Sequence, residues 1–163
     1  MTSYLRGSDN FSNFGGKILQ NKRVFSTTWQ SIASTSLVDL SNLSITMTPI
    51  QSTSTIFLRA FISSNLVYVN SFTFLKDGAK TISGVGSNSN ESDTHLTFYS
   101  GNSPTAMASW MIQHSETSGT SSRTYTVAGT SGWAGTAYTL YINGRNSNDM
   151  QSSCTFEAFE VAA

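Results

Sequence analysis

The stretch Leu43-Ser-Ile-Thr-Met-Thr-Pro49 opens the block of sequence that decides the fold. Leu43, Ile45 and Met47 alternate with serine and threonine until Pro49 ends the run. A spacing of two residues places the three apolar side chains on one face of a β-strand, whereas a helix would scatter them around its axis. The stretch therefore predicts a strand with one buried face.

The next run, residues 55–62, alternates with apolar groups on both sides. Ile56 and Leu58 share one face, while Phe57 and Phe61 share the other. A strand with two apolar faces is typical of one that is covered on both sides. We therefore expect both faces of this strand to be covered, the second one by a partner surface.

Residues 67–74 predict a third strand, but their pattern changes phase. Val67 and Val69 fall on one face, and Phe72 and Phe74 fall on the opposite one. An extra residue inserted into a strand shifts its alternation by one position. The pattern predicts a β-bulge near residues 70–71.

The remainder of the chain reads as further short strands separated by turns. Asp77-Gly78 predicts a tight hairpin, because a type I′ turn needs positive φ at both central positions, and residues 79–85 should then pair back on the preceding strand. Residues 30–42 read as a connection, and Gly129–Gly135 reads as a glycine-rich loop. We predict an all-β fold without substantial helix, an antiparallel, jelly-roll-like β-sandwich of about eight to ten strands. The sandwich should span residues 17–163, after an N-terminal arm of residues 1–16.

The composition limits the possible partners. Nine basic and nine acidic residues give a net charge of zero, and charged residues make up 11% of the chain. Nucleic-acid binding needs a concentrated basic patch, so a nucleic-acid partner is not expected. The sequence shows no secretory signal peptide and no apolar run long enough to cross a membrane, so membrane insertion is not expected.

Residues suited to catalysis or metal binding form only weak patterns. His114 and Glu116 should share a strand face, as should Asp93 and His95. A zinc deaminase would need two further cysteines, but Cys154 is the single cysteine and reads as a small core residue. We expect no metal, no cofactor and no enzymatic activity, although carboxylates such as Asp93 and Glu116 can still converge in space.

Aromatic residues provide the remaining functional signal. Trp133, Tyr99 and Tyr141 are candidates for stacking on a sugar or receptor, with Trp133 alternatively acting as a lid over one end of the sandwich. In the arm, four apolar residues are candidates for attachment to a virion or for docking into another subunit: Tyr4, Leu5, Phe11 and Phe14.

Several motifs together resemble a group of bacteriophage virion proteins found largely in aquatic phages. The motifs are Gly16-Lys-Ile-Leu-Gln20, a tryptophan followed by a serine-rich crossing, Leu43–Pro49, Ile56-Phe-Leu-Arg-Ala60, Tyr138-Thr-Leu-Tyr-Ile-Asn-Gly144 and the ending Phe159-Glu-Val161. The resemblance covers most of residues 15–162 and implies a β-sandwich fibre tip or surface decoration, commonly trimeric, without catalytic residues. The short arm differs from long tail fibres, which carry a shaft before the domain.

The leading hypothesis is a non-enzymatic virion structural protein, a homotrimer of the surface-fibre or tail-fibre type that contacts the host surface. Its partners would be copies of itself, other virion proteins and a glycan or receptor on the host. The resemblance also implies synthesis in the host cytoplasm and localisation to the virion. Two alternatives stay open: a capsid decoration protein that stabilises the particle, and a carbohydrate-binding module. A hydrolase ranks last.

Overall fold

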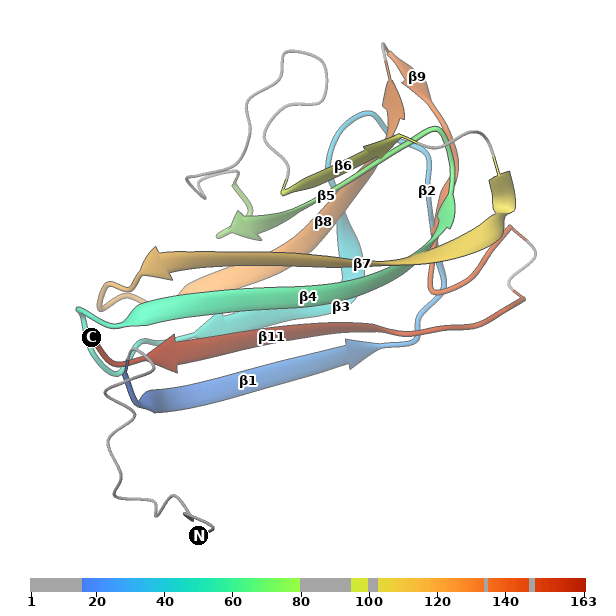
Figure 1. The fold of residues 1–163 in the computed structure, drawn as a ribbon. Coiled ribbons are helices and arrows are strands. Elements are labelled where there is room, and N and C mark those ends of the chain that lie inside the picture. Colours follow the sequence, from blue (N-terminus) through green and yellow to red (C-terminus); the bar gives the residue numbers. More distant parts are fainter. Residues whose placement is uncertain (1–15, 80–94, 100–102, 134, 147–148) are drawn as a thin grey trace, which may run out of the picture.

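A computed structural model describes residues 16–79, 95–99, 103–133, 135–146 and 149–163 (Figure 1). Every regular element in these ranges is a β-strand. The strands are β1 (Ile18–Ser26), β2 (Gln30–Ile32), β3 (Val38–Met47), β4 (Thr55–Leu66), β5 (Val69–Lys76), β6 (Leu96–Tyr99), β7 (Ser103–Thr117), β8 (Arg123–Trp133), β9 (Thr136–Ala137), β10 (Leu140–Ile142) and β11 (Cys154–Val161).

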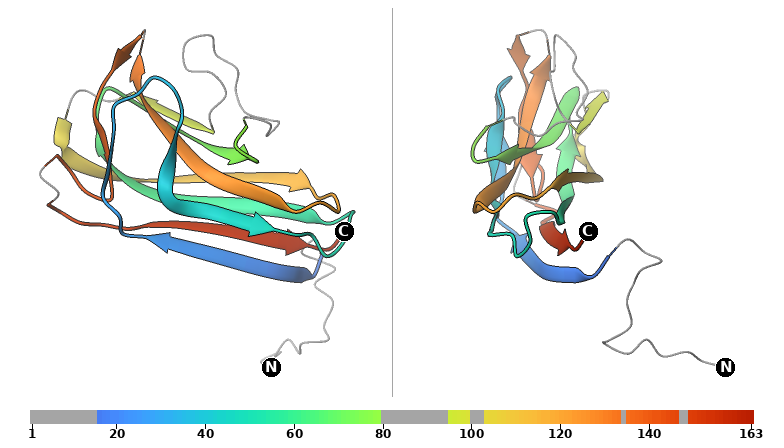
Figure 2. Two further views of the ribbon diagram at one scale, coloured as in Figure 1. Left: turned by 180° about the vertical axis from the view of Figure 1, so that it is seen from behind. Right: turned by 90° about the vertical axis from the view of Figure 1, so that its left-hand side faces the viewer.

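The strands form two antiparallel sheets. The six-stranded sheet has the order β1-β11-β4-β10-β2, and β7 pairs with the other edge of β4. The five-stranded sheet has the order β3-β8-β5-β6, with β9 paired to β8. Figure 1 has β1, β11, β4 and β7 in front, and the view from behind in Figure 2 brings β3 and β8 forward. The sheets are therefore two layers of a β-sandwich, so the predicted all-β antiparallel sandwich is confirmed, with eleven described strands in place of about eight to ten.

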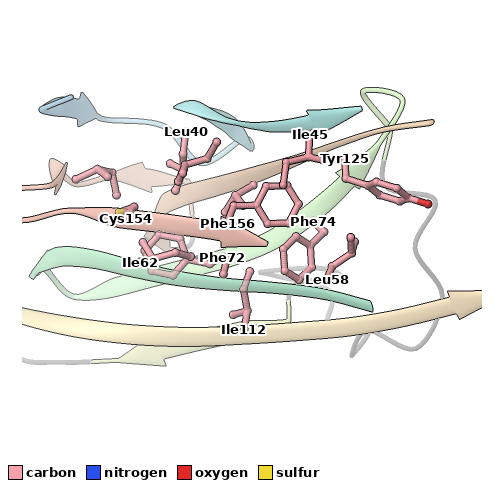
Figure 3. Packing of buried hydrophobic residues seen from close by; sticks show 14 of the residues in the cluster. Leu40, Ile45, Leu58, Ile62, Phe72, Phe74, Ile112, Tyr125, Cys154 and Phe156 are labelled. Carbon is pink, nitrogen blue, oxygen red and sulfur yellow. The ribbon is translucent and has the colours of Figure 1, made fainter. Parts of the chain in front are cut away.

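One hydrophobic core fills the space between the sheets (Figure 3). Leu43, Ile45 and Met47 are buried, as their alternation predicts. From the opposite sheet, Leu58 and Phe156 point toward them, and the rings of Phe156 and Phe74 stack at 5.5 Å. The alternation of β3, β4 and β11 thus supplies most of the core.

The predicted bulge near residues 70–71 is wrong. Strand β5 pairs with β6 and β8 without any shift of register, and Asn70 lies opposite both Phe98 and Ser131. The apparent change of phase arises because Val67 belongs to the turn between β4 and β5. In addition, β5 is buried on both faces, so its sequence need not alternate.

The predicted loop at Gly129–Gly135 is also wrong in its first half, because β8 continues to Trp133. Gly129 pairs with Phe72, and a Cβ added to Gly129 would lie 3.0 Å from the Phe72 ring. Glycine at this position gives an aromatic ring room to pack on the strand.

Two other boundaries differ from the expectation. The segment 30–42 contains β2 and the start of β3, so it is more than a connection. The turn at Asp77-Gly78 is confirmed, because both residues have positive φ and Lys76 bridges to Ala79. The returning strand predicted for residues 79–85 lies, apart from Ala79, outside the described residues.

Candidate functional site

The outward face of the six-stranded sheet is the candidate functional site, and strand register places its residues in rows across the strands. Phe57 of β4 lies opposite Phe159 of β11, and Phe61 lies opposite Met111 of β7. Directly opposite residues in an antiparallel pair share a face, so each row forms one continuous strip. This outward face is turned to the viewer in Figure 1.

The strips are unusually apolar for a surface. Phe57 is 44% exposed and Phe61 is 42% exposed, and Met111 on the neighbouring strand is 54% exposed. At the edge of the same sheet, Phe25 and Ile18 of β1 are exposed as well. Large apolar side chains gathered on one face of a sheet mark an interaction site or a groove.

A row of charged residues crosses the middle of this face. Arg59 donates two hydrogen bonds to the same carboxylate oxygen of Glu157, from Nε at 3.1 Å and Nη2 at 2.7 Å. Arg23 approaches the other oxygen of Glu157 at 3.8 Å. The guanidinium of Arg59 also lies 5.5 Å from the ring centre of Phe61 and 5.6 Å from that of Phe159. The charges are thus paired within the face and held among aromatic rings.

A groove of about 700 Å³ is hollowed into the same face. Phe57 and Phe159 supply its aromatic wall, and Arg59, Gln113 and Ser115 supply polar groups. The groove combines ring faces with hydrogen-bond donors and acceptors, as many ligand sites do.

The expectation that both faces of β4 are covered is corrected for the single chain. Ile56, Leu58, Ala60 and Ile62 are buried, but the face that carries Phe57 is open. The second face therefore remains available for a partner.

The candidate histidines and the candidate glutamate lie together on the inner side of β7. His114 and Glu116 share a face, as their spacing predicts, and the rings of His114 and His95 are in edge contact at 5.1 Å. Glu116 accepts hydrogen bonds from Lys76 Nζ at 2.7 Å and from the Tyr125 hydroxyl at 2.6 Å. Both oxygens of the Glu116 carboxylate are therefore occupied.

This cluster does not form a metal centre. In the described ranges, no three residues among histidine, cysteine, aspartate and glutamate gather closely enough to hold a metal ion. Asp93, the predicted companion of His95, lies outside those ranges. Burial raises the pKa of Cys154 to about 11, so its thiol stays protonated in the core.

The three candidate receptor-binding aromatics lie on different strands. Tyr141 is in β10 of the six-stranded sheet, where its ring stacks on Trp29 at 5.5 Å. Tyr99 is in β6, opposite Val69, and Trp133 ends β8, opposite Thr136. The side chains of Tyr99 and Trp133 are outside the described part of the structure.

The arm candidates Tyr4, Leu5, Phe11 and Phe14 also lie outside the described residues. Sequence reasoning singled out neither Phe159 nor Met111 as a surface group. The alternation within a strand shows which residues share a face of that strand. It does not show which strands pair, and only the pairing brings these two residues beside Phe57 and Phe61.

Comparison of the chain with protein-family models and with curated proteins finds no match. In the described part of the chain there is no helix long and apolar enough to span a membrane.

Proposed function

We propose that this chain is a non-enzymatic structural protein of a bacteriophage virion that works as a homotrimer, with the outward face of the six-stranded sheet as its self-association surface. The observation that carries the proposal is the exposure of Phe57, Phe61 and Met111 on adjacent strands of one sheet. Each of these side chains is about half exposed, so covering it contributes on the order of 1 kcal/mol.

The size of the face suits a specific contact. It covers four neighbouring strand positions, β1, β11, β4 and β7. With strands about 4.8 Å apart and roughly eight residues along each, its footprint is on the order of 500 Å². If the surface that covers the face matches it in area, the two partners together would bury about 1,000 Å², the lower limit for a specific interface. The internal pairing of Arg59 with Glu157 keeps the charge on the face compensated when water is removed.

A closed three-fold ring requires each copy to offer two different surfaces. The free edge of β7 is our candidate for the second surface. Among the described strands, the backbone of β7 pairs with β4 alone, although the Trp110 and His114 side chains contact Phe98 and His95 beside it. Residues 103–113 of this strand carry no charged side chain. A face and an adjoining edge lie roughly at right angles, so their contact turns successive copies into a ring, whereas two opposite faces would build a filament.

The proposed virion role is supported by the composition of the sequence and by its resemblance to phage proteins. A surface rich in serine and threonine with few charges is typical of a particle exterior, and the resemblance to aquatic phage proteins implies a fibre tip or surface decoration. Ile18 pairs with Val161, so the first and last strands start and finish at one end of the sandwich. Attachment at that end would leave the loops around Trp29 and Tyr141 free to meet the host surface.

Immunogold labelling of phage particles that carry this gene tests the virion role. Antibodies against the purified protein should label the outside of intact particles, at the tail for a fibre and over the head for a decoration protein. Absence of label on intact particles, while the same antibodies detect the protein free in the lysate, would contradict a virion role.

The groove beside Phe57 and Phe159 favours a second candidate function, carbohydrate binding. The two rings can stack on sugar faces, and Arg59, Gln113 and Ser115 can bind hydroxyl groups. This function requires the face to be open in solution. A glycan array with the wild type and a Phe159→Ala variant distinguishes the two: binding that the variant loses supports the glycan site, and no binding by a trimer supports self-association.

A further inference from the structure

Two ring contacts close one side of the sandwich, between the edge strands β6 and β7. His95, which directly precedes β6, contacts His114 of β7 with ring centres 5.1 Å apart. Phe98 of β6 contacts Trp110 of β7 at 4.5 Å. We call this pair of contacts the β6–β7 seam. It links the last strand of one sheet to the last strand of the other.

The two histidines are held in a poorly solvated place. His95 Nδ1 is hydrogen-bonded to the Thr73 hydroxyl at 2.9 Å, and its ring also packs edge-on against Phe74. The Nε2 atoms of His95 and His114 are both buried and have no hydrogen-bond partner among the described residues. A protonated ring carries an N–H donor at both nitrogens, so protonating either histidine would leave a charged Nε2–H without an acceptor among the described residues.

Within the described ranges, three other titratable groups lie at this place, on β5, β7 and β8. Lys76 of β5 adds a positive charge, and Tyr125 of β8 donates a hydrogen bond to Glu116. Among the described residues, Glu116 of β7 is the one anion at this place, but Lys76 and Tyr125 already bind its oxygens. Two protonated histidines would thus face each other and Lys76, with Glu116 compensating one charge.

We propose that the β6–β7 seam is an acid-sensitive latch: protonation of the His95–His114 pair separates β6 from β7 and opens this side of the sandwich while the remaining core stays folded. The strand β6 is suited to local release, because it is four residues long and pairs with β5 alone. Short edge strands with few buried contacts open at a low free energy.

The shifts in the pKa values of the two histidines agree with the burial of their rings. Burial, followed by the nearby charge of His114, lowers the pKa of His95 from 6.5 to about 4. Burial also lowers the pKa of His114, and the attraction of Glu116 only partly offsets this. The closed seam binds these protons more weakly than the open one, so its stability is complete above about pH 6.5 and falls as the pH drops toward 4.

The opposite side of the sandwich is closed by contacts of a different kind. There, Gln20 Nε2 donates to the Thr48 carbonyl at 2.8 Å, and Lys22 Nζ donates to the Thr46 carbonyl at 2.6 Å. Neither of these contacts contains a histidine. The strand β1 therefore serves as an internal control.

Hydrogen exchange followed by mass spectrometry, corrected for the intrinsic effect of pH, tests the latch. Between pH 7 and about pH 4.5, exchange in residues 95–99 and 109–114 should increase about tenfold or more, while residues 18–26 keep their protection. A His95→Gln, His114→Gln double variant should lose this increase. If the double variant does not fold, the His114→Gln single variant should show a smaller increase than the wild type.

Equal protection of the seam at both pH values would overturn the proposal. It would also be overturned if the folded variant kept the full acid-induced increase. Simultaneous loss of protection in residues 18–26 would show global unfolding and would equally contradict a local latch.

Discussion

Glu160 accepts a hydrogen bond of 2.6 Å from the hydroxyl of Ser54, a residue 106 positions earlier in the chain. The Glu160 side chain is fully buried at the end of β11. The same carboxylate accepts hydrogen bonds from the backbone amides of Ile50 and Gln51 and from the Gln20 side chain. One buried anion therefore fixes the loop between β3 and β4 to both β1 and β11.

Replacing this carboxylate should destabilise the fold strongly. In a Glu160→Gln variant, the negative charge is lost and one carboxylate oxygen becomes an NH2 donor, which can no longer accept from Gln20 and Ile50. We expect a loss of about 3 kcal/mol in the free energy of unfolding, measured by urea denaturation. Glu157→Gln is the matched control on the same strand, since its partners are partly exposed, and it should cost less than about 1 kcal/mol. Equal losses in both variants would contradict the role of Glu160 in fixing this loop.

The Glu160 carboxylate should also make the stability of the fold depend on pH. Burial alone would raise the pKa of Glu160, but the hydrogen bonds from Ser54, Gln20 and the two amides outweigh it and lower the pKa from 4.5 to about 2. The folded state thus binds this proton more weakly than the unfolded chain. Its contribution to stability is complete above pH 4.5 and is lost as the pH falls toward 2.

Urea denaturation at a series of pH values measures this effect. The free energy of unfolding of the wild type should fall between pH 4.5 and pH 2 more steeply than that of Glu160→Gln. Parallel pH profiles of the two proteins would show that this carboxylate is not responsible.

Gly129 should tolerate no side chain. A Cβ there would meet two atoms of the Phe72 ring, at 3.0 and 3.1 Å, in the middle of the core. We expect Gly129→Ala to destabilise the protein by roughly 1–3 kcal/mol through overpacking. Gly119→Ala is the control, because a Cβ at Gly119 meets nothing within 4 Å. Thermal unfolding of the two variants checks this, and a harmless Gly129→Ala would contradict the packing argument.

Gly129 also shows why the sequence could be misread. Its neighbours in the chain are polar and small, so local composition predicts a loop. The need for glycine comes from Phe72, which lies 57 positions away on another strand. By contrast, Leu43, Ile45 and Met47 could be assigned from the sequence alone, because a one-sided strand carries its orientation in its own alternation.

Only part of the candidate site could be predicted from the sequence, because the rest depends on contacts between strands that are far apart in the chain. The second apolar face of β4 is visible in the sequence through Phe57 and Phe61. The rows that they form with Phe159 and Met111 depend on strand order and register, which the sequence does not encode locally. The contact of His95 with His114 likewise joins residues from two sheets.

The outward face predicts a specific effect of polar substitution. A Phe61→Ser variant should weaken self-association at least tenfold, because burial of the ring contributes on the order of 1–2 kcal/mol to each contact. Its cost to the stability of the separated chain should be well below that of removing a fully buried ring, since 42% of Phe61 is already exposed there. Ile50→Ser removes a more exposed apolar side chain, 63% exposed, from the loop between β3 and β4 and serves as the control. Sedimentation velocity over a dilution series measures both, and equal association of the two variants would contradict the assignment of the face.

The most direct measurement is the mass of the purified wild-type protein in solution by light scattering. Self-association through the outward face of the six-stranded sheet predicts a stable particle of three times 17.6 kDa, which Phe57→Ser, Phe61→Ser shifts toward the single chain. A mass of 17.6 kDa for the wild type at micromolar concentration would contradict the account, as would a trimer that the double variant leaves intact.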